Sequence, residues 1–247
     1  MNLDDLTDLA TQAGHIINDT DRESHEKSDG TPVTQADLSA SKKIRETLLD
    51  ETPYTYVDEE HGVTSRGTQK WWLVDPLDGT KDFMRGTTEY TVNIALIDGE
   101  TPVIGVVHVP ATKTTYAATD NSAWRDNEEI TVENVAVEDA VVAVSKSHPD
   151  DDLDAFLQEL PVAGRRGIGS SLKGCRVADN TVNLYPRMQS LHGWDVAAMH
   201  AVINGAGAVM QNWEGDQVTY SYDNKNVDPF VAGHPRLVSD VLDRAHD

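Results

Sequence analysis

The sequence predicts a layered fold of helices and β-strands in two halves that share one cleft. Two observations support this prediction. Up to about residue 137, strand-like segments follow one another through short polar turns, which is typical of an antiparallel sheet, and from residue 138 strands alternate with helices. No linker, internal repeat or low-complexity tract interrupts the chain. We therefore expect a first half over residues 1–137 and a second half over residues 138–247, packed as α and β layers.

The first half begins with two expected helices. Apolar residues recur at three- and four-residue spacing over residues 3–19, which predicts an amphipathic helix. A polar loop over residues 21–30 precedes a second helix that runs to about Leu49. Thr34 and Asp37 have the spacing of a capping box at the start of that helix. On this pattern alone, Asp37 is a carboxylate that caps a helix.

Strands fill the remainder of the first half. Their expected positions are residues 54–57, 71–74, 89–97, 103–109 and 114–118. Asp98-Gly99-Glu100 indicates a hairpin turn between the third and fourth of these strands. Residues 120–129 are expected to form a polar loop around Trp124.

Strands and helices alternate in the second half. Strands are expected at residues 141–145, 166–168, 182–185, 208–210 and 230–232. Helices are expected at residues 151–160, from Gly169-Ser170-Ser171 onward, at 194–204 and at 235–244. The single cysteine, Cys175, excludes an internal disulfide and a thiolate zinc cluster, and we expect it to be a buried, reduced core residue.

The charge of the chain limits its partners. Forty-two acids against 20 bases give a formal charge of −22, which argues against binding to nucleic acid or to an anionic membrane. The N-terminus lacks the basic and apolar regions of a signal peptide, and no run of 18 apolar residues occurs, so we expect a cytoplasmic protein. The abundance of acids and the low lysine content also suggest adaptation to high salt, where self-repulsion is screened. Full activity after dialysis into dilute buffer would exclude that adaptation.

Two carboxylates follow the apolar segment Trp71–Val74, separated by three positions. Pro76 stiffens the turn and allows Asp75 and Asp78 to face the same small volume. Two hard carboxylates held this close repel one another unless a cation lies between them, and oxygen ligands suit Mg²⁺ better than zinc. A magnesium site is therefore expected here. The alternative is an acidic surface turn, whereas the alternating acids of an EF-hand are missing.

Three further segments carry groups that suit an anionic ligand or its metal. Asp195 begins the helix at 194–204, where it either interacts with the helix dipole or supplies a third segment of metal ligands. Ser170 and Ser171 head another helix whose free amides could hold an anion, with Lys173 one turn further. Arg187 follows a strand and could close the opposite side.

Taken together, these segments resemble the inositol monophosphatase superfamily of Mg²⁺-dependent, lithium-sensitive phosphatases. The segments that carry the resemblance are Pro32-Val33-Thr34-Gln35-Ala36-Asp37, Asp58-Glu59-Glu60, Trp72-Leu73-Val74-Asp75-Pro76-Leu77-Asp78-Gly79-Thr80-Lys81-Asp82-Phe83 and Trp194-Asp195-Val196-Ala197-Ala198. Within the superfamily, four segments are most similar to the 3'(2'),5'-bisphosphate nucleotidases of sulfate assimilation, namely Leu77-Asp78-Gly79-Thr80-Lys81, Thr91-Val92-Asn93-Ile94-Ala95-Leu96-Ile97, Gly169-Ser170-Ser171-Leu172-Lys173 and Leu184-Tyr185-Pro186-Arg187. The similarity covers residues 3–235, and it implies an αβαβα layered sandwich.

The resemblance also implies a role for each group of residues. Two or three Mg²⁺ ions would be held by Glu59, Asp75, the carbonyl of Leu77, Asp78 and Asp195. Asp37 and Thr80 would orient and deprotonate a water activated by the metal, with Glu60 as an acid beside the site. Gly79 and Thr80 would bind the phosphate that is cleaved, and Ser170, Lys173 and Arg187 would hold the second phosphate.

The implied reaction is hydrolysis of 3'-phosphoadenosine 5'-phosphate to AMP and phosphate, by a monomer or a homodimer that acts on this small molecule. A broad inositol or sugar phosphatase of the same fold is the alternative, and a phosphate-binding protein without catalysis is a third. Three positions depart from the family pattern: Asp82 stands where Glu is common, Asp58 precedes the acidic pair where a small residue is expected, and His192 stands before Gly193 at the lip of the pocket.

Overall fold

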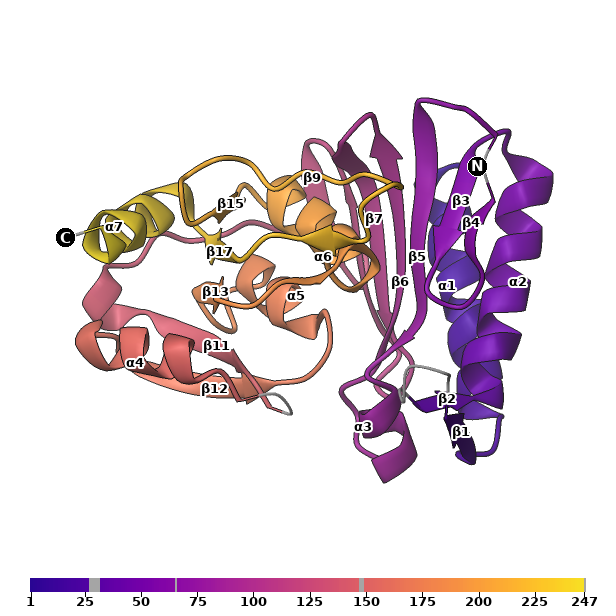
Figure 1. Cartoon of the computed structure of the whole chain (residues 1–247), viewed down its shortest axis with the longest axis horizontal. Helices are drawn as coiled ribbons and strands as arrows, with labels where there is room; N and C mark the ends of the chain where they lie inside the picture. The colour runs from indigo at the N-terminus through magenta and orange to yellow at the C-terminus, as the bar shows by residue number, and fades with distance from the viewer. Residues whose placement is uncertain (27–31, 65, 147–148, 247) are drawn as a thin grey trace.

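Helices and strands are stacked in five layers. The structure, a computed structural model, describes residues 1–26, 32–64, 66–146 and 149–246. Figure 1 shows a helical pair, a large sheet, a second helical pair, a smaller sheet and an outer helical pair in succession. This succession confirms the predicted αβαβα layered sandwich.

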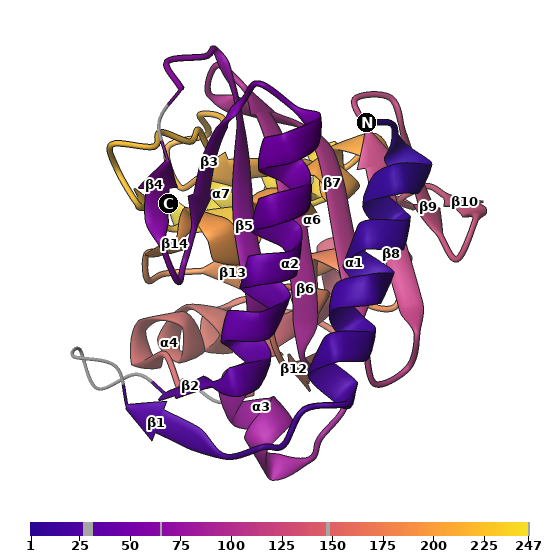
Figure 2. The same ribbon diagram turned by 90° about the vertical axis from the view of Figure 1, so that its right-hand side faces the viewer.

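The first layer consists of α1 (Leu3–Asn18) and α2 (Gln35–Glu51). They lie side by side across one face of the large sheet (Figure 2). Both helices begin with a capping box, since Asn2 caps α1 and Thr34 caps α2, as the spacing of Thr34 and Asp37 predicts. Their apolar faces cover one hydrophobic core against the sheet.

The large sheet has eight strands in the order β10-β9-β8-β7-β6-β5-β3-β4. All its neighbouring strands are antiparallel except β3 and β5, which are parallel. Its strands are β3 (Thr55–Asp58), β4 (Gly62–Thr64), β5 (Lys70–Asp78), β6 (Thr91–Asp98), β7 (Thr101–Val109), β8 (Thr114–Thr119), β9 (Ser122–Arg125) and β10 (Glu128–Ile130). The expected strands of the first half are therefore present, and β4 is an addition.

The expected polar loop over residues 120–129 is wrong, because this segment forms β9 and β10. Two-residue turns join β8 to β9 and β9 to β10. Asp126 and Asn127 in the second turn have positive φ angles of 51° and 68°, as the favoured type of hairpin turn requires. Turn residues at both ends of a short alternating segment were the signal for these hairpins.

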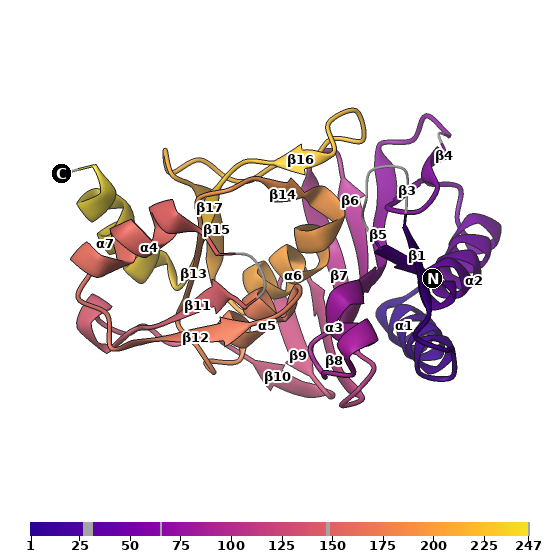
Figure 3. The same cartoon turned by 60° about the horizontal axis from the view of Figure 1, so that its bottom comes forward.

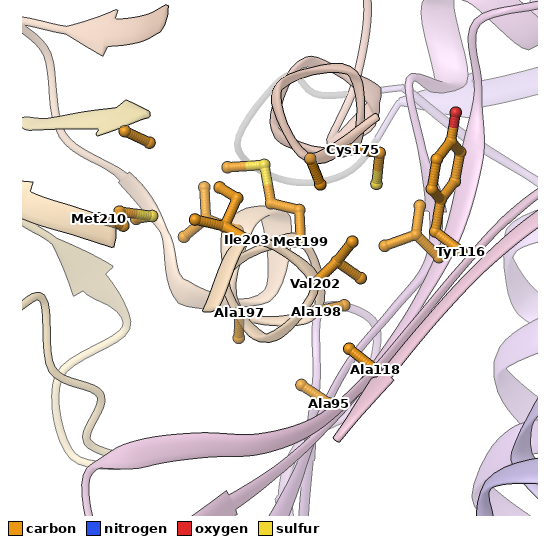
Figure 4. Close-up of a cluster of buried hydrophobic side chains, with 14 of the residues drawn as sticks. Ala95, Tyr116, Ala118, Cys175, Ala197, Ala198, Met199, Val202, Ile203 and Met210 are labelled. Atoms are coloured by element: carbon orange, nitrogen blue, oxygen red, sulfur yellow. The ribbon is translucent and has the colours of Figure 1, made fainter. Parts of the chain in front are cut away.

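The middle layer consists of α5 (Leu172–Ala178) and α6 (Gly193–Gly205), which fill the space between the two sheets. Figure 4 shows their side chains packed against small residues of the large sheet, such as Ala95 and Ala118. Gly105 on β7 lets α6 approach, because a Cβ atom there would lie 2.3 Å from the Ala198 carbonyl oxygen. Cys175 is a free, buried residue of this core, as predicted.

The smaller sheet has five strands in the order β12-β11-β13-β17-β15. These strands are β11 (Val141–Ser145), β12 (Gly164–Ile168), β13 (Leu184–Arg187), β15 (Val209–Asn212) and β17 (Phe230–Gly233). The outer helices α4 (Asp151–Glu159) and α7 (Pro235–Ala245), with the short 3₁₀ helix η1 (Val137–Asp139), pack on its outer face. The change of sheet thus occurs between β10 and β11, and the division at residues 137 and 138 into two halves stays a prediction.

Two small sheets and one short helix complete the fold. β1 (Ser24–Glu26) pairs with β2 (Pro32–Thr34), and β14 (Leu191–His192) pairs with β16 (Asn226–Val227). Part of the loop expected over residues 21–30 is therefore strand, and residues 27–30 lie outside the described residues. α3 (Thr80–Arg85) lies beside the β1–β2 pair (Figure 3). Among the described residues, no helix combines the length and the apolar character that crossing a bilayer requires.

Candidate active site

One cavity of about 240 Å³ brings together most of the predicted site residues. Its walls come from the ends of β5 and β13, the first turn of α6 and the segment that leads into α5. The predicted residues that line it are Glu59, Asp75, Leu77, Asp78, Gly79, Thr80, Ser170, Lys173, Arg187 and Asp195. Asp37 and Glu60 are not among the lining residues, and the catalytic role of Glu60 stays a prediction.

A bulge in β5 turns both aspartates of the central segment into the cavity. The segment expected as a turn after Val74 belongs to β5, which continues to Asp78. Asp75 pairs with Asn93 and Asp78 pairs with Thr91, so three residue steps along β5 lie opposite two steps along β6. Residues three apart on a regular strand point to opposite faces, and the extra residue restores them to the same face. Pro76 suits this position because it has no N–H to contribute to the ladder.

Four carboxylates form what we name the acidic wall: Glu59, Asp75, Asp78 and Asp195. Burial raises the pKa of Asp75 well above its ordinary value, and the charges of the other three carboxylates raise it further. Burial likewise raises the pKa of Asp195 well above its ordinary value, followed by the charges of Asp78 and Glu59. Burial also raises the pKa of Asp78 to about 6, although the charge of Lys173 acts in the opposite direction. The acidic wall is therefore a site of concentrated negative charge.

The chemistry of the acidic wall suits a hard divalent cation. Its donors are carboxylate oxygens, with the Leu77 carbonyl in the same lining, and a cation there would relieve the repulsion that raises the pKa values. In the described part of the chain, no three His, Cys, Asp or Glu side chains are already arranged to hold one ion. Mg²⁺ typically takes one or two carboxylates and completes its shell with water and substrate phosphate, so the donor set fits Mg²⁺.

Asp37 caps α2 and also contacts Thr80, while its catalytic role stays a prediction. Its Oδ2 atom accepts hydrogen bonds from the N–H of Thr34 at 2.7 Å and from the Thr34 hydroxyl at 2.5 Å, which is the cap of α2. Its Oδ1 atom lies 3.1 Å from the Thr80 hydroxyl, at the wall of the cavity. Burial raises the pKa of Asp37 above its ordinary value. The helix cap thus holds the carboxylate rigidly behind Thr80.

A buried hydrogen-bond network fixes Asp78. The Ser171 N–H donates to Asp78 Oδ2 at 2.5 Å, and the Ser171 hydroxyl donates to Asn93 Oδ1 at 2.7 Å. Thr91 Oγ1 lies 2.9 Å from the Ser171 hydroxyl oxygen and is therefore the donor of that bond. The sequence predicted free backbone amides at the start of α5, but two of them have partners. The N–H of Ser171 donates to Asp78, and the N–H of Leu172 donates to the Ser170 hydroxyl.

Two buried cations form what we name the basic wall: Lys173 and Arg187, each 7% exposed. Lys173 Nζ donates to the Ser170 carbonyl at 2.7 Å, and burial lowers the pKa of Lys173 to about 8. Arg187 Nε donates to the Gln189 carbonyl at 3.3 Å. Ser170, which holds a positive φ of 47°, lines the cavity next to them. The charges of Asp78 and Asp195 also act on Lys173, and the anion-binding role of the two cations stays a prediction.

The comparisons with known proteins agree with this geometry. A model of the inositol monophosphatase family matches residues 4–242. The chain belongs to the inositol monophosphatase family. A 3'(2'),5'-bisphosphate nucleotidase CysQ of Salmonella typhimurium is 39% identical over 231 residues, which cover 89% of this chain and 94% of that protein.

Solved structures of the family have the same fold. CysQ from Bacteroides thetaiotaomicron superposes with a TM-score of 0.79 at 29% identity, covering 92% of this chain and 94% of that one. The extragenic suppressor protein suhB from Bartonella henselae superposes with a TM-score of 0.84 at 25% identity, covering 96% of this chain and 95% of that one. The family fold predicted from the sequence is therefore confirmed.

Two of the departures from the family pattern have structural explanations. Asp58, which is fully buried, accepts from the Ser41 hydroxyl at 2.6 Å, from the Tyr56 hydroxyl at 3.1 Å and from the His61 N–H at 2.7 Å. These bonds anchor the turn that carries Glu59. His192 stacks on Trp194 with ring centroids 4.7 Å apart and lies at the N-terminus of α6.

Sequence reasoning missed three polar residues of this region: Tyr185, Asn93 and Ser171 as a partner of Asp78. Tyr185 lines the cavity, and Asn93 and Ser171 lie behind Asp78. A polar residue within an otherwise apolar strand was the available signal for Asn93, whose neighbours on β6 are buried and apolar. Tyr185 gave no such signal, because an aromatic residue is typical of a strand.

Proposed function

We propose that this protein is a Mg²⁺-dependent 3'(2'),5'-bisphosphate nucleotidase that hydrolyses 3'-phosphoadenosine 5'-phosphate to AMP and phosphate. Membership of the inositol monophosphatase family supports a phosphatase, and the curated relatives that carry the nucleotidase name support this activity. The observation that supports a bisphosphate substrate is the presence of an acidic wall and a basic wall in one cavity. A monophosphate needs one anion site, whereas a bisphosphate needs a second set of cations.

In this proposal the acidic wall holds two or three Mg²⁺ ions through Glu59, Asp75, Asp78, Asp195 and the Leu77 carbonyl. Bound Mg²⁺ supplies neutralisation of the phosphate charge, a lower pKa of the attacking water and stabilisation of the leaving oxygen. Gly79 and Thr80 bind the transferred phosphate at the end of β5. Gly79 has a φ of 88°, and a Cβ atom there would lie 3.1 Å from the Glu89 carbonyl oxygen. A larger residue at this position would therefore displace the backbone that lines the cavity.

The proposed base is the Thr80–Asp37 pair. The water oxygen forms a bond to phosphorus while the bond from phosphorus to the 3'-oxygen breaks. Thr80 Oγ1 accepts the proton of the water and passes its own proton to Asp37 Oδ1, from which it is separated by 3.1 Å. Burial, which raises the pKa of Asp37, makes this carboxylate a better proton acceptor. The 3'-oxygen takes a proton from solvent water and becomes the hydroxyl of AMP, and Asp37 returns its proton to the solvent.

The basic wall places the substrate. Lys173, Arg187 and Ser170 hold the phosphate that is not cleaved, and this fixes the other phosphate against Thr80. Inhibition by Li⁺ and a place in sulfate assimilation belong to the same proposal. The competing function is a broad inositol or sugar phosphatase, and an inositol monophosphate would leave the basic wall without a phosphate to bind.

Phosphate release from the nucleotide bisphosphate, inositol monophosphate and fructose bisphosphate, each with Mg²⁺ and with or without Li⁺, tests the proposal. We expect release from the nucleotide to exceed that from inositol monophosphate by more than tenfold at equal low concentrations, because one charge-assisted contact is worth about 1.5–3 kcal/mol. Fructose bisphosphate also carries a second phosphate, so lower release from it would show that the nucleoside contributes to the choice of substrate. Equal rates on the three substrates would refute the nucleotidase assignment.

A further inference from the structure

The Tyr185 hydroxyl is a buried polar group whose partner the fold does not provide. Tyr185 is only 1% exposed, and its hydroxyl makes no hydrogen bond with any of the residues that the structure describes. Buried hydroxyls are normally satisfied. Four other buried tyrosines follow this rule: Tyr56 bonds to Asp58, Tyr90 to Asn18, Tyr116 to Asp179 and Tyr220 to His200.

The open side of this hydroxyl is the active-site cavity. Within the described ranges, the side-chain polar atoms that are both enclosed and unpaired are Arg45 Nε and Asp150 Oδ2, so the Tyr185 oxygen is not sealed in the core. Tyr185 lines the cavity. The charged groups that act on its hydroxyl are Arg187, Asp78 and Asp195, and all three line the same cavity.

The ring of Tyr185 contacts Phe230 on β17 and Lys173 at the start of α5. Its edge contact with Phe230 has a centroid distance of 5.2 Å and an interplanar angle of 87°. Lys173 Nζ lies 5.5 Å from the ring centroid, and Arg187 stands two positions along β13, on the same face of the strand. The side chain of Tyr185 therefore lies beside both cations of the basic wall. Burial also raises the pKa of Tyr185, so that it stays a neutral donor.

We propose that the Tyr185 hydroxyl is a substrate-binding group that donates a hydrogen bond to the phosphate that is not cleaved, together with Lys173 and Arg187. This inference rests on the proposed function for the identity of the substrate. A donor on a packed strand loses little conformational entropy when it binds a phosphate oxygen, and the ligand gives a hydrogen-bond partner to a group for which the fold provides none.

The test compares Tyr185→Phe with Tyr116→Phe, which removes a hydroxyl that donates to Asp179 at 2.7 Å outside the cavity. For each variant, the melting temperature, the calorimetric Kd for 3'-phosphoadenosine 5'-phosphate in metal-free buffer, and KM and kcat for this nucleotide and for adenosine 3'-monophosphate are measured. We expect Tyr185→Phe to raise Kd and KM for the bisphosphate about tenfold, to leave the values for the monophosphate unchanged, and to leave the melting temperature unchanged or higher. Tyr116→Phe should lower the melting temperature without changing KM.

Three results would overturn the inference: an unchanged Kd in Tyr185→Phe, an equal rise of KM for both nucleotides, or a lower melting temperature with unchanged KM. Failure of the proposed function is a separate result, in which the wild-type protein releases no phosphate from the bisphosphate. The calorimetric comparison then still decides the role of Tyr185, and absence of bisphosphate binding by the wild type would overturn both proposals.

Discussion

The two walls of the cavity are built in opposite ways. The acidic wall gathers like charges from three elements, and its most buried member, Asp75, is 1% exposed. The basic wall holds two cations that the fold orients through backbone carbonyls of Ser170 and Gln189. The carboxylates of the first wall repel one another, whereas Lys173 of the second wall interacts with the charges of Asp78 and Asp195. In the proposed function, turnover belongs to the acidic wall and choice of substrate to the basic wall.

The largest expected effect concerns the acidic wall. Asp78→Asn should lower phosphate release by more than about 10³-fold, because a metal site contributes several kcal/mol to charge stabilisation in the transition state. The same variant should unfold at higher temperature than the wild type in EDTA, since one repulsive charge is removed, and added Mg²⁺ should close this gap. The matched control is Asp98→Asn. Asp98 ends β6, whereas Asp78 on β5 pairs with Thr91 at the start of β6. Retained activity in Asp78→Asn would contradict the metal assignment.

The proposed proton acceptor gives the next largest effect. Thr80→Val keeps the shape of the side chain and removes the hydroxyl that bonds Asp37, so kcat should fall about 10²–10⁴-fold with little change in KM. Thr80→Ser should restore most of the activity. A Thr80→Val enzyme with full kcat would leave Asp37 as a helix cap alone.

Changes in the basic wall should alter binding rather than turnover. Lys173→Ala should raise KM for the bisphosphate about 10–100-fold and affect a monophosphate much less, because a hydrogen bond to a charged group is worth about 1.5–3 kcal/mol. Steady-state kinetics on both substrates provide the measurement. An equal effect on the two would break the division of labour between the walls.

The smallest effect lies outside both walls and separates stability from activity. Burial lowers the pKa of His200 to about 4, and its imidazole Nδ1 lies 2.9 Å from the Tyr220 hydroxyl. Because the unfolded chain binds this proton at a pKa near 6.5, the contribution of His200 is complete above pH 6.5 and is lost as the pH falls toward 4. The total loss is about 3 kcal/mol. The free energy of unfolding of the wild type and of His200→Gln, measured by denaturation at pH 7 and pH 5, checks this. An equal change between the two pH values in both proteins would contradict it.

Most of the fold could be predicted from local sequence patterns. The three-and-four spacing in α1, the capping box at Thr34 and the alternation after residue 138 each predict an element that the structure contains. The failures have two different causes. The extension of β5 through Pro76 depends on long-range pairing with β6, whereas the hairpin of β9 and β10 depends on the local positive φ angles at Asp126 and Asn127.

The site divides along the same line. Asp75 and Asp78 were selected because two carboxylates follow one apolar segment, whereas Glu59 and Asp195 were assigned as metal ligands through the family resemblance. The partners of Asp78 were not found, because Ser171 lies 93 positions from it in the sequence and meets it only when the residue before α5 reaches β5 and β6 in the folded chain. Tyr185 was missed for a similar reason, since only the folded structure shows that a tyrosine in a strand lacks a partner.

The most direct test of the two-wall account is the ratio of kcat/KM for 3'-phosphoadenosine 5'-phosphate and adenosine 3'-monophosphate, measured with the wild-type protein and Mg²⁺. The two substrates differ only in the phosphate that the basic wall is proposed to hold. The account predicts a preference of at least about tenfold for the bisphosphate, from one charge-assisted contact or more. Equal values would show that the basic wall does not choose the substrate.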